Sequence, residues 1–360
     1  MNGEITVPGR KKSGESPRLV LVGDVAIEFA DCREQMRKIA PYFKESAISF
    51  CNCEWPLTNR GAPWPGKAGR VVRSSPDKIL TYTYCGFDVV SLANNHIMNY
   101  GPDGLRQTID LLDKAGIKHC GAGANLAAAH RPAFVRWKKL RVAFLGYTSV
   151  FTPGFEAAKN RPGMAVIRVD STYRAPKRLN EVPGLPMEIK TVPRAADMDR
   201  LCEDIAGARK RADEVVVSIH WGVAGGHQHL VGYQKDVGRA AIDTGAKLVL
   251  GHGPHTLQPI ELYKGGLIAY SVGQCGFDMV STDFTDESIA IEVPLEGGGF
   301  GKPLVRPIGN SVFHPEILDI DRGRSCLEWL ARLSRPMGTT WRITGDAAEP
   351  MKKGGRASFV

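Results

Sequence analysis

Five apolar runs in the sequence are each followed at once by side chains that can bind a metal ion. The runs are LVLVG, AISFCNC, VVSLA, VVVSI and KLVLG. The side chains that follow them are Asp24, Glu54, Asn94, Asn95, His96, His220, His252 and His255. A single Asp or Asn in such a place commonly caps the next helix, but this number of carboxylates, amides and histidines exceeds what capping needs. Carboxylates and imidazoles together suit divalent manganese, iron or zinc, so the pattern predicts a metal site.

We expect distinct roles within this set. The expected metal ligands are Asp24, Glu54, Asn95, His220, His252 and His255. His96 is the natural proton donor, and Asn94 is expected to support the turn and to lie within reach of a substrate. His220 and His252 could instead be hydrogen-bonded core histidines. We expect one or two divalent ions, of manganese, iron, zinc or calcium.

Further polar residues are candidates for contacts with a substrate. His227 and His229 lie in the Gly-rich stretch GVAGGHQHL, which predicts either a solvated loop or an acid/base or substrate contact. Arg73, Trp221 and Gln274 are also expected to contact a substrate. The basic run from Arg131 to Arg141 could attract an anionic substrate, although a solvated basic face is the simpler explanation.

The elements that must position these side chains are predicted from hydrophobic periodicity. Strands are predicted at 19–23, 47–53, 87–92, 141–147, 214–219, 247–251 and 267–272, and helices at 102–116, 198–208 and 326–333. Several strands are apolar throughout, which is typical of a mainly parallel sheet that is covered on both faces. Because parallel strands share one carboxyl edge, we expect the candidate ligands to converge there.

Composition narrows the class of protein. The chain has 360 residues, of which 43% are hydrophobic and 24% charged, proportions that exclude fibrous, disordered and membrane-embedded classes. The formal net charge of +9 suits an anionic or peptide substrate, and no aromatic residues alternate with basic ones as in a nucleic-acid platform. No apolar export or membrane-spanning segment is seen, so we expect a cytoplasmic protein whose eight cysteines are mostly reduced and buried.

The expected organisation is one main domain with extensions. Residues 1–17 and 346–360 are predicted to be flexible tails, 18–310 the domain, and 311–345 a helical extension. Residues 151–196 contain six prolines and are expected to form a long surface excursion that could cover the site as a lid.

Seven stretches resemble a known family. They are GDV, NCEWPLT, SLANNHIMNYGPDGL, GAGANLAAA, SIHWG, GHGPHTLQPIELY and IAYSVGQCGFD, and they are similar to the CapA-type branch, named for poly-γ-glutamate capsule synthesis, of the calcineurin-like metallophosphatases. The resemblance implies an α/β sandwich in which two central mixed sheets are flanked by helices. It also implies the ligand set given above, with Glu54 in the bridging position and His96 as general acid.

The chain departs from the usual family pattern at four places. Asn99 stands where relatives commonly have an acidic residue, Gly253 where they have a histidine, and Gln274 where they have an asparagine. After the HWG motif, Val223 and Ala224 occupy a stretch where relatives often place a glutamate. Asn99 therefore removes the carboxylate expected beside the proton donor.

The resemblance leaves three functions open. The first is a metal-dependent hydrolase that acts on a phosphoester or related bond in cell-envelope, polyglutamate or peptide metabolism. The second is an epimerase that uses the metal and paired histidines to exchange a Cα proton of a peptide or amino acid. The third is a non-catalytic accessory subunit that assists a polymer ligase. A ligase or a precursor peptide is thus an expected partner.

Overall fold

Two mixed β-sheets form the centre of the molecule in the computed structural model, which describes residues 5–6, 17–67, 69–225, 230–278 and 286–352. The first sheet has the order β1-β7-β8-β12-β13-β15-β14. Its strands are β1 Ile5–Thr6, β7 Ala133–Trp137, β8 Leu140–Thr148, β12 Glu214–His220, β13 Leu248–His252, β15 Gly266–Ala269 and β14 Ile260–Tyr263. Neighbours from β8 to β15 run parallel.

The second sheet has the order β21-β22-β19-β17-β2-β3-β4-β5. Its strands are β21 Thr339–Thr344, β22 Ala347–Lys352, β19 Leu304–Gly309, β17 Ser288–Glu296, β2 Arg18–Ala26, β3 Ile48–Cys53, β4 Val89–Ser91 and β5 Lys118–Cys120. Strands β16 Gln274–Phe277, β18 Gly299–Phe300 and β20 Glu316–Ile317 pair with its members, and β6 Ala122–Gly123 pairs with β9 Gly163–Met164. Neighbours from β2 to β5 are parallel, whereas β17 is antiparallel to β2.

The sheets pack face to face, as the alternation of side chains along β2 shows. Leu19 and Leu21 point into the core between the sheets, where Phe50 of one sheet stacks on Phe144 of the other with ring centroids 5.3 Å apart. Val20 and Val22 point to the opposite face, which helices cover. This two-layer core confirms the α/β sandwich with mixed sheets that the resemblance implied. The strands predicted from apolar runs do pair parallel with one another, but they are divided between two sheets, each of which also has antiparallel members.

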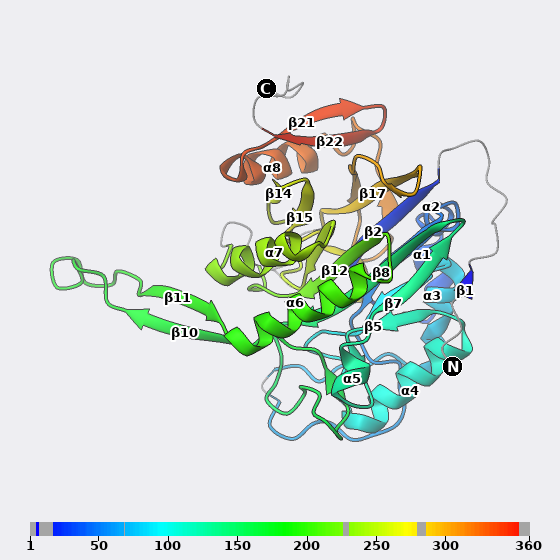
Figure 1. Ribbon diagram of the computed structural model, residues 1–360, viewed down its shortest axis with the longest axis horizontal. Coiled ribbons are helices and arrows are strands. Elements are labelled where there is room, and N and C mark those ends of the chain that lie inside the picture. Colours follow the sequence, from blue (N-terminus) through cyan, green and yellow to red (C-terminus); the bar gives the residue numbers. More distant parts are fainter. Residues whose placement is uncertain (1–4, 7–16, 68, 226–229, 279–285, 353–360) are drawn as a thin grey trace.

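Helices cover the outer faces of both sheets (Figure 1). Four helices pack on the sheet that contains β2: α1 Cys32–Met36, α2 Ala40–Lys44, α3 Ile79–Cys85 and α4 Gly101–Lys114. Two pack on the sheet that contains β12: α6 Ala195–Arg209 and α7 Gly232–Thr244. The short helix α5 Leu126–Ala129 and the late helix α8 Arg324–Ser334 complete the α-helices of the described residues, with 3-10 turns at Pro76–Lys78 and Arg335–Met337. No helix among the described residues has the length and apolar character to span a bilayer.

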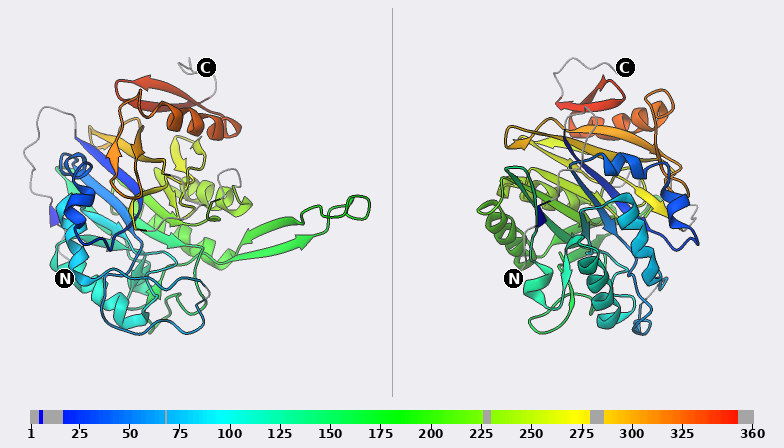
Figure 2. Two further views of the ribbon diagram at one scale, coloured as in Figure 1. Left: turned by 180° about the vertical axis from the view of Figure 1, so that it is seen from behind. Right: turned by 90° about the vertical axis from the view of Figure 1, so that its right-hand side faces the viewer.

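The Pro-rich segment 151–196 builds a β-hairpin. Strands β10 Val169–Arg174 and β11 Glu188–Pro193 pair antiparallel with Tyr173 opposite Ile189. The hairpin projects away from the sheets in both Figure 1 and Figure 2. Its base is attached to α7, because the Thr191 hydroxyl accepts a hydrogen bond from the Tyr233 backbone N–H at 3.1 Å. The lid role of the segment stays a prediction.

The C-terminal region differs from its prediction. Residues 347–352, expected to belong to a flexible tail, form β22, which pairs with β21 and β19. Ala347 and Ala348 are buried, and Trp341 of β21 is only 3% exposed. The tail prediction is wrong for these residues because they pair with β21 and β19, a long-range contact that local composition does not reveal.

Candidate metal centre

One cluster of candidate ligands gathers around Oδ1 of Asp24. His220 and His252 end the neighbouring strands β12 and β13 and are partners in register. Oδ1 of Asp24 lies 2.8 Å from Nδ1 of His252 and 3.7 Å from Nδ1 of His220, and the two Nδ1 atoms are 3.1 Å apart. All three residues are buried. Nε2 of His252 contacts the Ser218 hydroxyl at 2.8 Å, which leaves Nδ1 directed at the cluster.

A second cluster uses the other oxygen of the same carboxylate. Oδ2 of Asp24 lies 3.4 Å from Nδ1 of His255, and Nε2 of His255 lies 3.5 Å from Oε1 of Glu54. These three residues are buried as well. Asp24 is therefore the carboxylate that both groups share, whereas Glu54 occurs in the second group. The bridging position of Glu54 stays a prediction.

Orphaned polar atoms show that this arrangement fits a cation. Glu54 is 0% exposed, and no described residue donates a hydrogen bond to either of its carboxylate oxygens. Oδ1 of Asn95, just beyond β4, is likewise buried without a hydrogen-bond donor among the described residues. A buried carboxylate and a buried amide oxygen without donors are costly unless a cation satisfies them. Carboxylate, amide and imidazole donors are the set that manganese, iron and zinc accept.

Amide side chains of neighbouring strands orient Asp24. The amide nitrogen of Asn52 donates to Oδ1 of Asp24 at 2.8 Å, and that of Asn94 donates to the Asn52 side-chain oxygen at 3.1 Å. On the other side, the Gly253 N–H donates to Oδ2 of Asp24 at 2.9 Å. These hydrogen bonds fix the orientation of the Asp24 carboxylate between the two sheets. A carboxylate that contributes one oxygen to each ligand group needs such a fixed orientation.

The loop after β13 takes a special backbone conformation to present His255. His255 has φ of 56° and Gly253 has φ of 104°, both in the left-handed region that L side chains rarely adopt. A Cβ on residue 253 would lie 2.9 Å from Nε2 of His220. A side chain at residue 253 therefore does not fit here while His220 keeps its place.

Charges within the site oppose one another. Burial alone raises the pKa of Asp24, but His252 and His220 outweigh it and hold that pKa well below its usual range. For Glu54, burial and the Asp24 charge together raise the pKa well above the usual range. Burial lowers the pKa of His255 to about 4, so its imidazole is neutral at pH 7. The Asp24 and Glu54 carboxylates thus lie close together at a buried site, an arrangement that a bound cation would stabilise.

His96 lies at the rim of the second group. Its Nε2 is 3.9 Å from Oε1 of Glu54, and its Nδ1 is 3.0 Å from the amide nitrogen of Asn99. That nitrogen also donates to the Val72 carbonyl oxygen at 3.1 Å, which identifies it as the NH2 group. Nδ1 of His96 therefore accepts, and the ring proton sits on Nε2, facing Glu54. Burial and the positive charge of Lys67 hold the pKa of His96 well below its usual range.

Lys67 is a residue of this site that sequence reasoning missed. Its ammonium group donates to the Asn95 carbonyl oxygen at 2.9 Å and lies 5.8 Å from the centroid of the Phe155 ring. Burial lowers the pKa of Lys67, whereas the Glu54 charge raises it. A lysine in a loop rich in Pro and Gly gives no periodic signal, so only the fold brings it to the metal centre.

Two residues expected to contact a substrate lie in the interior instead. Trp221 is 0% exposed, stacks on Tyr270 and donates from Nε1 to the Tyr270 carbonyl oxygen at 2.7 Å. It follows His220 directly, so it points to the opposite side of the chain, into the core under α7. Asn94 is also 0% exposed, and its side-chain oxygen accepts from the backbone N–H groups of His96 and Ile97. It supports the turn, as expected, and its side chain is enclosed in the interior.

Two of the remaining candidate residues lie near the metal centre, and two lie outside the described residues. Gln274 of β16 pairs with Asp24 in register and hydrogen-bonds the His255 ring, so it supports a ligand. The Arg73 guanidinium lies 4.5 Å from the centroid of the Tyr100 ring, and Tyr100 directly follows Asn99 in the chain. His227 and His229 lie outside the described residues.

Comparisons with known proteins place the chain in a family. The family model described as "Bacterial capsule synthesis protein PGA_cap" matches residues 9–279. The PGA biosynthesis protein CapA of Bacillus subtilis is 30% identical over 271 residues, which are 75% of this chain and 63% of that protein. A probable polyglutamine synthesis accessory protein of Mycobacterium tuberculosis is 33% identical over 207 residues, 56% of this chain and 48% of that protein.

A solved structure adds a distant likeness. The calcineurin-like phosphoesterase YfkN of Bacillus subtilis is 12% identical, covers 89% of this chain and 98% of that chain, and has a TM-score of 0.41. The chain spans about half to two thirds of the length of the curated relatives it matches. With three quarters of its residues aligned to a CapA protein and the family model covering 9–279, this chain belongs to the PGA_cap family of bacterial capsule synthesis proteins.

Proposed function

We propose that the chain is a divalent-metal-dependent hydrolase that acts on a phosphoester or related bond of an anionic substrate. The observation that carries the proposal is the buried Glu54 carboxylate, to which no described residue donates a hydrogen bond, opposite the group formed by Asp24, His220 and His252. Asp24, Glu54, Asn95 and the three histidines would hold one or two ions. When bound, such ions activate water and polarise a phosphoryl or carbonyl oxygen.

The residues around the centre suit the binding of an anion. Lys67 supplies a positive charge next to Glu54 and His96, held in place by the Asn95 carbonyl oxygen. Its ammonium group can pair with a substrate oxygen that the metal site does not use. Arg73 is exposed, lies over the Tyr100 ring and can extend this positive rim. The site thereby favours a substrate with at least one oxyanion group.

His96 would assist the departure of the leaving group. Its Nε2–H faces the centre because Asn99 occupies Nδ1. In the neutral form this N–H donates a hydrogen bond to the leaving oxygen, and in the protonated form it transfers the proton outright. Asn99 has no charge with which to stabilise the protonated ring, so the transfer is confined to lower pH than an acidic neighbour would allow.

An aryl-phosphate assay tests the hydrolase directly. Purified chain is stripped with a chelator, reloaded with manganese, iron or zinc, and assayed with aryl phosphomonoesters and diesters. We expect turnover that needs the metal and that falls at least a hundredfold in Glu54→Gln and in His96→Gln. His314→Gln is the control, since His314 is exposed and is not among the grouped ligands. Turnover that survives Glu54→Gln undiminished would refute the assignment.

Epimerisation at a peptide Cα is the second candidate, and Lys67 is the observation that favours it. A half-buried amine whose pKa burial lowers can accept a proton, and it lies beside His96 at the centre. Incubation of the metal-loaded chain with peptides in heavy water would then introduce deuterium at Cα, and Lys67→Met would abolish the exchange. Exchange without phosphoester turnover would favour the epimerase, whereas the absence of both, together with capture of a polymer ligase, would favour the accessory role.

A further inference from the structure

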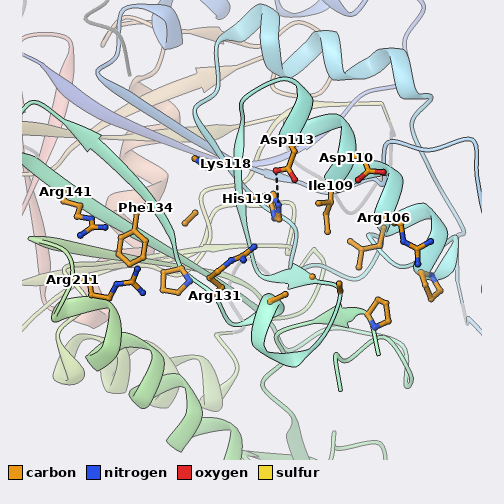
Figure 3. A pocket seen from close by; sticks show the side chains of 18 residues that line it. Arg106, Ile109, Asp110, Asp113, Lys118, His119, Arg131, Phe134, Arg141 and Arg211 are labelled. Carbon is orange, nitrogen blue, oxygen red and sulfur yellow. Dashed lines mark ion pairs between the residues drawn. The ribbon is translucent and has the colours of Figure 1, made fainter. Parts of the chain in front are cut away.

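A second polar cavity lies away from the metal centre, on the side of the molecule where α4, β5 and β7 meet (Figure 3). Its volume is about 590 Å3, within the range of small-molecule sites. No residue of the metal centre lines it. Its walls carry five basic side chains, which are Arg106, Lys118, Arg131, Arg141 and Arg211, against the two carboxylates of Asp110 and Asp113.

Two of these guanidinium groups have no acidic partner among the described residues. No carboxylate oxygen of the described residues lies within 4 Å of the Arg131 or Arg211 guanidinium group. Arg106, by contrast, forms an ion pair with Asp103. The Arg211 guanidinium lies over the Phe134 ring at 4.5 Å from its centroid, and that of Arg141 lies 4.6 Å from the same centroid. Placing two guanidinium groups that have no acidic partner among the described residues at one cavity costs free energy, which a bound anion would offset.

His119 provides an independent observation at the floor of the cavity. Its Nδ1 is buried and meets no hydrogen-bond partner among the described residues, while its Nε2 lies 3.6 Å from the exposed carboxylate of Asp113. Burial and the nearby charges of Arg131 and Lys118 outweigh the Asp113 charge and lower the pKa of His119. Figure 3 shows His119 and Arg131 directed toward the same space. Nδ1 of His119 has no hydrogen-bond partner among the described residues, and it lies in the same cavity as the Arg131 guanidinium, which has no acidic partner there. A bound ligand would satisfy both groups.

We propose that this cavity binds a small anion with two or more carboxylate or phosphate groups. Guanidinium forks at Arg131 and Arg211 fit planar or tetrahedral oxyanions, and they stand on different walls, one before β7 and one after α6. Leu105 and Ile109 of α4 supply apolar contact for the ligand's carbon skeleton. The sequence run from Arg131 to Arg141 is therefore split: Arg131 and Arg141 line the cavity, whereas Lys138 and Lys139 do not.

Equilibrium dialysis with two defined probes tests the proposal. The probes are fructose 1,6-bisphosphate and the tricarboxylate γ-glutamylglutamate, and the recovered probe is checked for integrity. We expect saturable binding of at least one probe, weakened tenfold or more in the double variant Arg131→Gln/Arg211→Gln. Lys139→Gln removes one charge from the same basic run outside the cavity and should change the dissociation constant less than twofold. The preferred probe identifies phosphate or carboxylate as the recognised group.

Three outcomes would overturn the proposal: neither probe binds, the double variant binds as the wild type does, or Lys139→Gln weakens binding as much as the double variant. Arg131 and Arg211 are exposed, so their replacement should leave the thermal midpoint unchanged. If the double variant does not fold, the two single variants are measured, each with an expected weakening of threefold or more. Binding at the metal centre is distinguished because it would persist in every one of these variants.

Discussion

At the scale of single residues, Glu54 is the side chain that most clearly calls for a bound cation. Its buried carboxyl group is next to the charge of Asp24 and receives no hydrogen bond from a described residue, so its ionised form is destabilised and its pKa lies well above the usual range in the metal-free protein. Glu261 is a matched contrast, because it is equally buried but accepts from Arg239 at 2.6 Å and from the Tyr270 hydroxyl at 2.7 Å. The two glutamates should respond to neutralisation in opposite ways.

Glu54→Gln should stabilise the metal-free chain at pH 7, by about 1–3 kcal/mol of unfolding free energy, because it removes an unpaired buried charge. The gain should shrink as pH falls, since the raised native pKa means that folded Glu54 takes up a proton more readily than unfolded Glu54. Glu261→Gln should lose stability with or without metal. Chemical denaturation in the presence of a chelator measures the stability of both variants. If Glu54→Gln were less stable than the wild type under these conditions, the Glu54 carboxylate would not be an unsatisfied buried group.

Gly253 should tolerate no side chain. Gly253→Ala combines a positive φ with contact on the His220 ring, so we expect a loss of metal affinity beyond the roughly 1 kcal/mol strain of the backbone alone. Gly265→Ala isolates that strain, since Gly265 also has positive φ but meets no atom within 4 Å. Metal titration of both variants is the measurement. Equal metal affinity in the two variants would show that residue 253 does not constrain His220.

Asn99→Asp should restore a charge beside Nδ1 of His96. A carboxylate there stabilises the protonated ring and raises the pKa of His96 from its depressed value. Turnover that requires protonated His96 should therefore persist to higher pH than in the wild type. The midpoint of the His96 titration, followed by NMR, should rise in the same way. Asn59→Asp, on an exposed loop, is the control. An unchanged His96 titration would mean that the residue at 99 does not set its protonation.

At the scale of elements, the sequence predicted the strands and their shared edge well. The runs ending at Asp24, Glu54, Asn95, His220 and His252 were identifiable because parallel strands buried on both faces are apolar throughout. Trp221 was misjudged although the alternation of side chains along a strand places it opposite His220. Lys67 could not be predicted, because its position depends on how a long loop crosses the site rather than on any local pattern.

The β10–β11 hairpin is expected to contribute little to the stability of the core. Tyr173 and Ile189 are 67% and 63% exposed, and the hairpin meets α7 only near its base at Thr191. Replacing residues 173–189 with a two-residue turn should leave the thermal midpoint within a few degrees of the wild type and metal binding unchanged. Calorimetry checks this, and a large loss of stability would mean that the hairpin packs on the body in solution.

At the scale of the whole molecule, two sheets bring ligands from distant parts of the chain into one centre. Asp24 and Glu54 come from one sheet, His220 and His252 from the other, and the loop after β13 adds His255. The sandwich itself was accessible only through the family resemblance, since apolar runs cannot tell a strand covered by helices from one covered by a second sheet. The cytoplasmic location stays a prediction.

Metal content is the measurement that tests the central claim most directly. The chain and its Glu54→Gln and His255→Gln variants are purified from manganese-, iron- and zinc-supplemented cultures and analysed by elemental mass spectrometry. We expect about one to two ions per wild-type chain, as two ligand groups that share Asp24 allow, and a clear loss in both variants. Wild-type protein without metal above the level of the variants, even after direct titration with all three ions, would contradict the account.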